Sequence, residues 1–145
     1  MYVRVVDVYD GDTITAIAET TPGQYHQLKF RLVGIDTPEM RRKPGQSDED
    51  ADAEKVGAVS ARNHVIEMIL GSVVYNANRE ALAASNSRDL IRKLFEENVS
   101  IVEIECGDFD KYGRVLGKIY IYIDKSRVCI NSDLIAGGYA VPYLV

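Results

Sequence analysis

Cysteine is scarce in this sequence, which has two cysteines, Cys106 and Cys129, among 145 residues. That scarcity excludes a disulfide-dense secreted scaffold, and a chain of this length can bury a core large enough to fold without disulfides or a structural metal. Both cysteines lie in runs typical of strands beside apolar neighbours, so we expect two reduced thiols in the core. Two scattered histidines, His26 and His64, do not complete the ligand spacing of a zinc site.

Long apolar runs are absent as well. The longest, such as 81–84 and 119–123, fall far short of the roughly 20 residues that a membrane-spanning helix needs. Near the N-terminus, Asp7 interrupts the chain before an apolar signal region develops, and no small-residue cleavage site follows. We therefore expect an intracellular protein that does not enter a membrane.

The chain has no excess of positive charge, since 17 lysine and arginine residues against 22 acidic residues give a net charge of −5. This excludes a protein that coats nucleic acid by bulk charge alone, so a polyanionic partner must be held locally. Basic residues do gather at Arg41–Lys43, and acidic residues in the run Ser47–Glu54. We interpret both as solvated loop or helix-start sequence.

The first third of the chain has the pattern of strands. Apolar and polar residues alternate from Val3, Asp10-Gly11 supplies turn chemistry, and the alternation resumes over 13–17. This predicts a hairpin with acids at its tip. A further strand is expected over 28–35, followed by an exposed polar loop from Asp36 to Asp50.

Helical spacing follows the loop. Apolar residues from Val56 onward recur at helical spacing until Gly71, which stands where a C-terminal cap belongs. Ser87 as N-cap and Asn98 as stop predict a second helix, whose apolar stripe is more typical of core packing than of a partner site. The stripe consists of Leu90, Ile91, Leu94 and Phe95.

The last third returns to strands, expected over 99–105 and 115–123, before a short helix over 132–136 capped by Asn131. We find no internal repeat or linker, so we expect residues 1–145 to form a single domain. Strands, inserted helices and further strands predict an α+β fold, with an OB-type five-stranded Greek-key barrel and packed helices as the leading candidate.

Acids stand where strands end or turn, at Asp10, Asp12, Asp36 and Glu39. Core packing does not explain carboxylates there. Carboxylate and carbonyl oxygens suit hard cations, so Asp12 and Asp36 converging from neighbouring strands would form a metal site with open positions. The alternative is ordinary turn chemistry, in which Asp-Gly and Asp-Thr-Pro merely shape the backbone.

Arg31 lies on the expected strand just before Asp36. Arg114 ends a charged turn before the next strand. Guanidinium groups suit the non-bridging oxygens of a phosphate. Together with two metal-binding acids and a third acid, they supply what a phosphodiester hydrolase needs, namely charge neutralisation, a polarising cation and a base for water.

Three motifs carry a family resemblance: Asp10-Gly11-Asp12-Thr13, then Phe30-Arg31-Leu32 running to Ile35–Glu39, then Asp110–Arg114. In order, spacing and identity they resemble the staphylococcal nuclease (thermonuclease) family. The resemblance implies an OB barrel with helices and a Ca²⁺-dependent nuclease that hydrolyses DNA and RNA with little sequence preference, leaving 3′-phosphate ends.

The resemblance also implies roles for individual residues. Ca²⁺ would be held by Asp12, Asp36 and the backbone carbonyl of Thr37. The glutamate beside the attacking water falls on Glu39. The phosphate-gripping arginines fall on Arg31 and Arg114, and further substrate contacts fall on Lys111, Tyr112 and Tyr143, the last as a stacking platform for a base.

The chain departs from the family at about 71–98, which is longer than usual between the first helix and the next strand. We expect this helical insertion to pack on the barrel and to replace part of the cover given by a C-terminal helix that many members have. We also expect a monomer. Two rival functions stay open: a noncatalytic nucleic-acid or protein-binding module of the same fold, and a structural Ca²⁺-binding domain.

Overall fold

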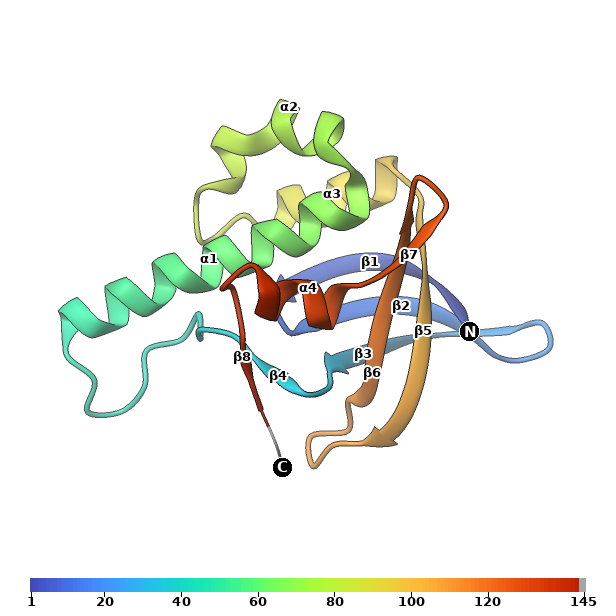
Figure 1. Ribbon diagram of the computed structural model, residues 1–145, viewed down its shortest axis with the longest axis horizontal. Coiled ribbons are helices and arrows are strands. Elements are labelled where there is room, and N and C mark those ends of the chain that lie inside the picture. Colours follow the sequence, from blue (N-terminus) through green and yellow to red (C-terminus); the bar gives the residue numbers. More distant parts are fainter. Residues whose placement is uncertain (144–145) are drawn as a thin grey trace.

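A computed structural model describes residues 1–143 and gives their elements as alternating groups of strands and helices (Figure 1). In chain order they are β1 (Tyr2–Asp10), β2 (Thr13–Thr21), β3 (Gln24–Leu32), β4 (Ile35–Asp36), α1 (Asp48–Leu70), α2 (Ser72–Leu82), α3 (Arg88–Glu97), β5 (Ser100–Phe109), β6 (Val115–Ile123), β7 (Ser126–Cys129), α4 (Ile130–Ala136) and β8 (Val141–Pro142).

The strands close into a barrel. Antiparallel pairing joins them in the order β3-β2-β1-β5-β6-β7, and a parallel pairing of β3 with β6 closes the ring. Within the described residues, the closed barrel is a mixed one of five strands, with four helices outside it, while β4 pairs with β8 in a separate short ribbon. The expected α+β fold with an OB-type barrel is confirmed.

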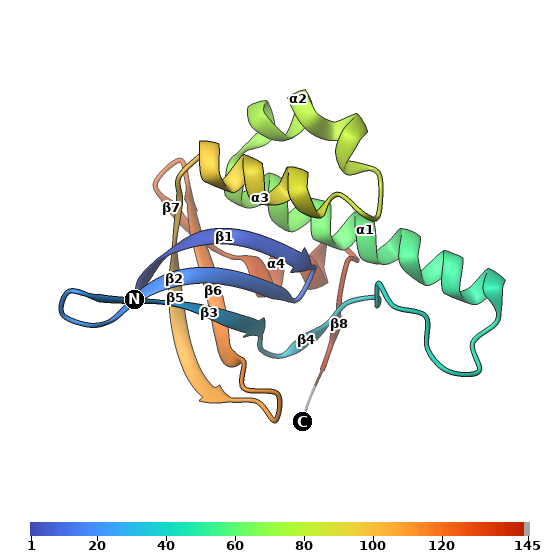
Figure 2. The same cartoon turned by 180° about the vertical axis from the view of Figure 1, so that it is seen from behind.

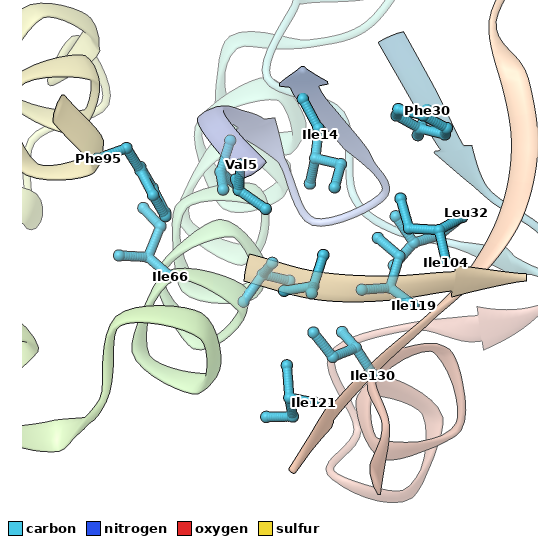
Figure 3. Close-up of a cluster of buried hydrophobic side chains, with 14 of the residues drawn as sticks. Val5, Ile14, Phe30, Leu32, Ile66, Phe95, Ile104, Ile119, Ile121 and Ile130 are labelled. Carbon is cyan, nitrogen blue, oxygen red and sulfur yellow. The ribbon is translucent and has the colours of Figure 1, made fainter. Parts of the chain in front are cut away.

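Alternating strand residues fill the barrel, since successive side chains point to opposite faces. On β2, for example, Ile14, Ala16 and Ala18 are buried while Thr15 and Ile17 between them are only partly so. Figure 3 shows side chains from β1, β2, β3, β5 and β6 in this core. The same cluster includes Ile66 of α1 and Phe95 of α3, so the helices extend the barrel core outward.

Helix α1 begins earlier than the apolar pattern indicates. The Ser47 side chain accepts a hydrogen bond from the Asp50 backbone N–H at 3.1 Å, and the acids of the first turn complement the helix dipole. The first turns extend beyond the barrel in Figure 1, and Val56 is 71% exposed. The loop expected to reach residue 50 therefore ends at Ser47, because capping starts the helix before any apolar residue is needed. Gly71, at φ +91°, ends α1 as predicted.

Helix α2 was not predicted as a separate element. It starts directly after Gly71, no side chain caps its N-terminus, and Tyr75 and Leu82 are its buried residues. Arg62 of α1 holds its far end: the fully buried guanidinium donates to the carbonyl oxygens of Leu82 at 2.9 Å and Ala84 and Ser85 at 3.1 Å. Burial, and then the positive charge of Arg88, lower the pKa of Arg62.

Helix α3 matches the predicted span, and its apolar stripe packs as expected. Ile91, Leu94 and Phe95 are buried, Leu90 is partly buried, and the helix lies against β1 in both views (Figures 1 and 2). Ser87 does not cap the helix. Its hydroxyl instead donates to the carbonyls of Ala81 and Ala84, which tightens the turn after α2.

Leu94→Ala should lower the free energy of unfolding by about 2–3 kcal/mol, because it removes a buried side chain and leaves a cavity. Val73→Ala on α2 is the matched control, since Val73 is 87% exposed and should change stability by less than about 0.5 kcal/mol. Urea unfolding of both variants measures the difference. Equal midpoints for Leu94→Ala and the native chain would contradict the packing of α3 on the barrel.

Two smaller expectations were wrong. Cys106 is exposed, because β5 is exposed from Glu105 to Phe109 and its register shifts after Cys106, while Cys129 is half-buried. Asn131 does not cap α4. Its buried amide accepts from the Ile119 N–H at 3.1 Å and donates to the carbonyls of Val33 at 2.9 Å and Gly117 at 3.1 Å, so it fastens the point where the barrel closes.

Among the residues that the structure describes, no helix combines the length and apolarity that crossing a bilayer would require.

Candidate nuclease site

The β1–β2 turn places Asp12 beside the segment that follows β4. Asp12 is 4% exposed, and its carboxylate accepts hydrogen bonds from the Thr13 hydroxyl at 3.1 Å and the Thr37 backbone N–H at 3.3 Å. A Cβ on Gly11 would come within 2.8 Å of both Ala61 and Thr37, so glycine is required for this close approach. The turn is thereby wedged between α1 and the Thr37 segment.

Arg31 brings the two predicted metal-binding acids together. It faces outward from the barrel core on β3, opposite Thr13 in the ladder with β2. One guanidinium nitrogen lies 3.3 Å from an Asp12 oxygen and 3.5 Å from an Asp36 oxygen, and the other donates to the Leu32 carbonyl at 2.7 Å. The Arg31 side chain is 13% exposed and Asp36 is 45% exposed, so the cluster opens to solvent on the Asp36 side.

Arg114 reaches the same cluster from the β5–β6 turn. Asp110 shapes that turn by accepting from the backbone N–H groups of Tyr112 and Arg114, both at 2.9 Å. The Arg114 Nε lies 2.6 Å from Asp110, and another of its nitrogens lies 3.4 Å from the Thr13 hydroxyl. Thr13 thus lies between Asp12 and Arg114, so both arginines converge on one corner of the barrel.

The carboxyl groups here crowd one another. Burial, followed by the Asp12 charge, raises the pKa of Asp10 to about 8. Burial, followed by the charges of Asp12 and Asp36, also raises the pKa of Glu39. The Glu39 backbone N–H donates to Glu54 at 3.2 Å, which fixes the segment after Thr37 to α1.

The three predicted substrate contacts lie in two places. Lys111 and Tyr112 are on the β5–β6 turn, with the Lys111 ammonium 5.2 Å and the Arg114 guanidinium 5.3 Å from the centre of the Tyr112 ring. Tyr143 follows β8, where its backbone N–H donates to the Gly34 carbonyl at 2.9 Å and its side chain is 48% exposed. Tyr143 does not line the cavity that contains Tyr112 and Arg114.

That cavity is a groove of about 1250 Å³ that starts at Asp10, Thr13, Glu39, Tyr112 and Arg114 and runs to α3. A smaller cavity of about 330 Å³ lies on the other side of Asp36 and Thr37, against residues 138–141. Sequence reasoning named Asp10 among the acids but gave it no site role. It also missed the groove residues outside the motifs, which include Arg4, Lys29, Arg88 and Arg92.

Weak signals for some of these residues were present. Lys29 stands two positions before Arg31 and so shares its strand face, and Arg88 and Arg92 share one helix face. No local pattern could show that this helix face borders the site.

Comparisons with known proteins agree with the second and third motifs. The model of a family described as "Staphylococcal nuclease homologue" matches residues 29–145, a range that starts after the β1–β2 hairpin with Asp12. The chain is also similar to "Uncharacterized protein MJ1439" of Methanocaldococcus jannaschii, at 26% identity over 147 residues. That alignment covers 99% of this chain and 59% of the relative, so the chain spans somewhat more than half of the relative's length.

Proposed function

Because the chain belongs to the staphylococcal nuclease homologue family, whose members are generally nucleases, we propose that it is a Ca²⁺-dependent phosphodiesterase acting on DNA and RNA. We propose further that it cleaves with little sequence preference and leaves 3′-phosphate ends. The observation that carries this proposal is the cluster of Asp12, Asp36 and Arg31, which is linked through Thr13 to Arg114 at one end of an open groove.

The residues present fit a hard cation. Carboxylate oxygens of Asp12 and Asp36 approach the same Arg31 nitrogen, and the buried Thr37 hydroxyl oxygen has no hydrogen-bond partner within the described residues. No three acidic, histidine or cysteine side chains in residues 1–143 form a metal cluster by themselves. The Thr37 carbonyl and oxygens from water or substrate would therefore complete the coordination. When bound there, Ca²⁺ supplies a Lewis acid that polarises a phosphoryl oxygen.

The other residues receive the roles that their chemistry allows. Arg31 and Arg114 donate to the phosphate oxygens and offset the negative charge that develops as the phosphodiester bond breaks. Glu39 accepts a proton from water or orients it, and its raised pKa makes it a stronger base than an ordinary glutamate. Lys111 and Tyr112 contact the substrate phosphate from the β5–β6 turn, and Tyr143 stacks on a base near β8.

The direct test is incubation with single-stranded DNA or RNA in Ca²⁺, in Mg²⁺ or in a chelator, read by gel and by mass spectrometry of the product ends. We expect degradation in Ca²⁺, none in chelator, and little in Mg²⁺, whose strict octahedral demand suits a loose carboxylate site poorly. Asp12→Asn should weaken Ca²⁺ binding at least tenfold by calorimetry, whereas Asp124→Asn in an exposed turn should not change it.

Full activity in Mg²⁺ with none in Ca²⁺ would refute the metal assignment. Nucleic-acid binding without cleavage under any condition would favour the noncatalytic module instead. Ca²⁺ binding without nucleic-acid binding or cleavage would favour a structural Ca²⁺-binding domain.

We also propose that residues 1–145 are one nuclease domain in which 71–98 is a helical insertion. The support is that Leu82 of α2 and Phe95 of α3 belong to the same buried cluster as the barrel strands.

A further inference from the structure

The groove that runs from the candidate site to α3, here called the α3 groove, has a floor of β-strands and one helical wall. Its floor is the outward face of β1, β2 and β3, where ladder pairing sets Thr15 between Asp7 and Lys29. Its wall is α3, which lies along β1 (Figure 2). The Arg4 guanidinium donates to the carbonyls of Phe95 and Glu96 at 3.5 and 3.4 Å, so the wall is fastened to the floor.

The α3 groove is positive although the chain is acidic. Among the described residues, six lysines and arginines and four acids line it. Asp7 is neutralised by an ion pair with Arg88 and a longer contact of 3.8 Å with Arg92. Lys29 and Arg41 are exposed and form no ion pair within residues 1–143. Positive charge is thus concentrated where a polyanion leaving the candidate site would pass.

Two exposed tyrosines stand in the same groove, each beside an arginine. The Arg88 guanidinium lies 5.2 Å from the centre of the Tyr9 ring, and Arg114 is placed similarly over Tyr112. Tyr9 is 40% exposed and Tyr112 is 71% exposed. Unstacked bases bind exposed aromatic rings, whereas the bases of a duplex are already stacked on one another and cannot reach them.

We propose that the α3 groove binds a single-stranded polynucleotide, with the strand running from the reacting phosphate at Arg114 past Tyr9 to Arg88 and Arg92. Phosphates contact the arginines of α3, which are one helical turn apart, and bases stack on the tyrosines. The helical insertion therefore extends the substrate site by several nucleotides. This inference rests on the proposed function for the position of the reacting end.

The test compares kcat/KM in Ca²⁺ for a single-stranded 12-mer and for a 5′-phosphorylated dinucleotide, which has far fewer phosphates to place along the groove. In Arg92→Glu, the ratio of the two values should fall roughly tenfold at low salt, since one phosphate contact is replaced by repulsion. Lys93→Glu makes the same charge change on the same helix outside the groove lining, and should leave the ratio within about twofold.

Fluorescence anisotropy in chelator measures binding without cleavage. The single-stranded 12-mer, as DNA or RNA, should bind at least about tenfold more tightly than the duplex of the same sequence, and Tyr9→Ala should remove much of that preference. Equal effects of Arg92→Glu and Lys93→Glu, or equal affinity for single strand and duplex, would overturn the inference.

Failure of the inference and failure of the proposed function are distinguishable. If the dinucleotide is cleaved normally and kcat/KM for the 12-mer does not depend on Arg92, the α3 groove inference alone is refuted. Absence of all cleavage refutes the nuclease, and the anisotropy series then decides whether the groove binds a single strand.

Discussion

Arg114→Ala should lower kcat about 10²-fold or more, while the fold and Ca²⁺ affinity are retained. Arg114 is held by Asp110 at the mouth of the groove and reaches the candidate site through Thr13, so it can donate to a phosphate without being part of the carboxylate pair. A donor that acts on charge developing in the transition state affects kcat, whereas one that only binds substrate affects KM. Steady-state kinetics on a short oligonucleotide separates the two.

Arg31→Ala should cause a similar loss of kcat but is a less selective variant. Its removal leaves the buried Asp12 carboxylate without its cation, so Ca²⁺ affinity and stability change as well. Arg127→Ala is the matched control. Arg127 lies on β7, forms an ion pair with Glu103 at 2.8 Å and lines neither described cavity. A near-normal kcat with a raised KM in Arg114→Ala would show that this arginine only binds substrate.

Arg62→Ala should lower the free energy of unfolding by about 3–5 kcal/mol, a large part of a typical domain's stability. The guanidinium is the shared donor for the carbonyls of Leu82, Ala84 and Ser85 and for the Asn63 side chain. Its loss leaves the buried Leu82 carbonyl and the partly buried carbonyls of Ala84 and Ser85 short of donors, and it also opens a cavity. Urea unfolding with a fitted m value measures the change.

Arg62→Met separates the two contributions, because it keeps most of the volume and removes every donor. We expect Arg62→Met to remain at least about 2 kcal/mol less stable than the native chain. Arg79→Ala on α2 is the control. Arg79 is exposed, its side chain hydrogen-bonds to Asn76 and lies 5.1 Å from the centre of the Tyr75 ring, and its loss should change stability by less than about 1 kcal/mol. Native-like stability of Arg62→Met would show that packing, and not the carbonyl contacts, holds the insertion.

Loss of the Arg62 contacts should also change substrate cleavage, because α2 and the turn after it connect α1 to α3. A loosened connection would let α3 move from β1 and would weaken the wall of the α3 groove. Arg62→Met should therefore lower the 12-mer to dinucleotide ratio of kcat/KM under conditions where it is folded.

Local signals in the sequence were enough for several elements. Asp10-Gly11 between two alternating segments predicted the β1–β2 hairpin. Ser87 and Asn98 predicted the limits of α3, although the Ser87 hydroxyl does not cap the helix. These signals succeed because turns, caps and periodicity depend on neighbours within a few residues. The site residues were named from three short motifs, and their roles in catalysis remain predictions.

Tertiary structure decided what depends on residues far apart in the sequence. The start of α1, the presence of α2, the exposure of Cys106 and the use of Asn131 as a barrel fastener follow from which segments pack together, not from local preference. The same holds for Arg62, whose acceptors lie about twenty residues away. Above all, Arg88 and Arg92 border the candidate site only because the stripe on the opposite side of α3 packs against β1. An amphipathic pattern determines that the apolar face of a helix packs against other apolar residues. Only the assembled barrel determines which surface the polar face of that helix borders.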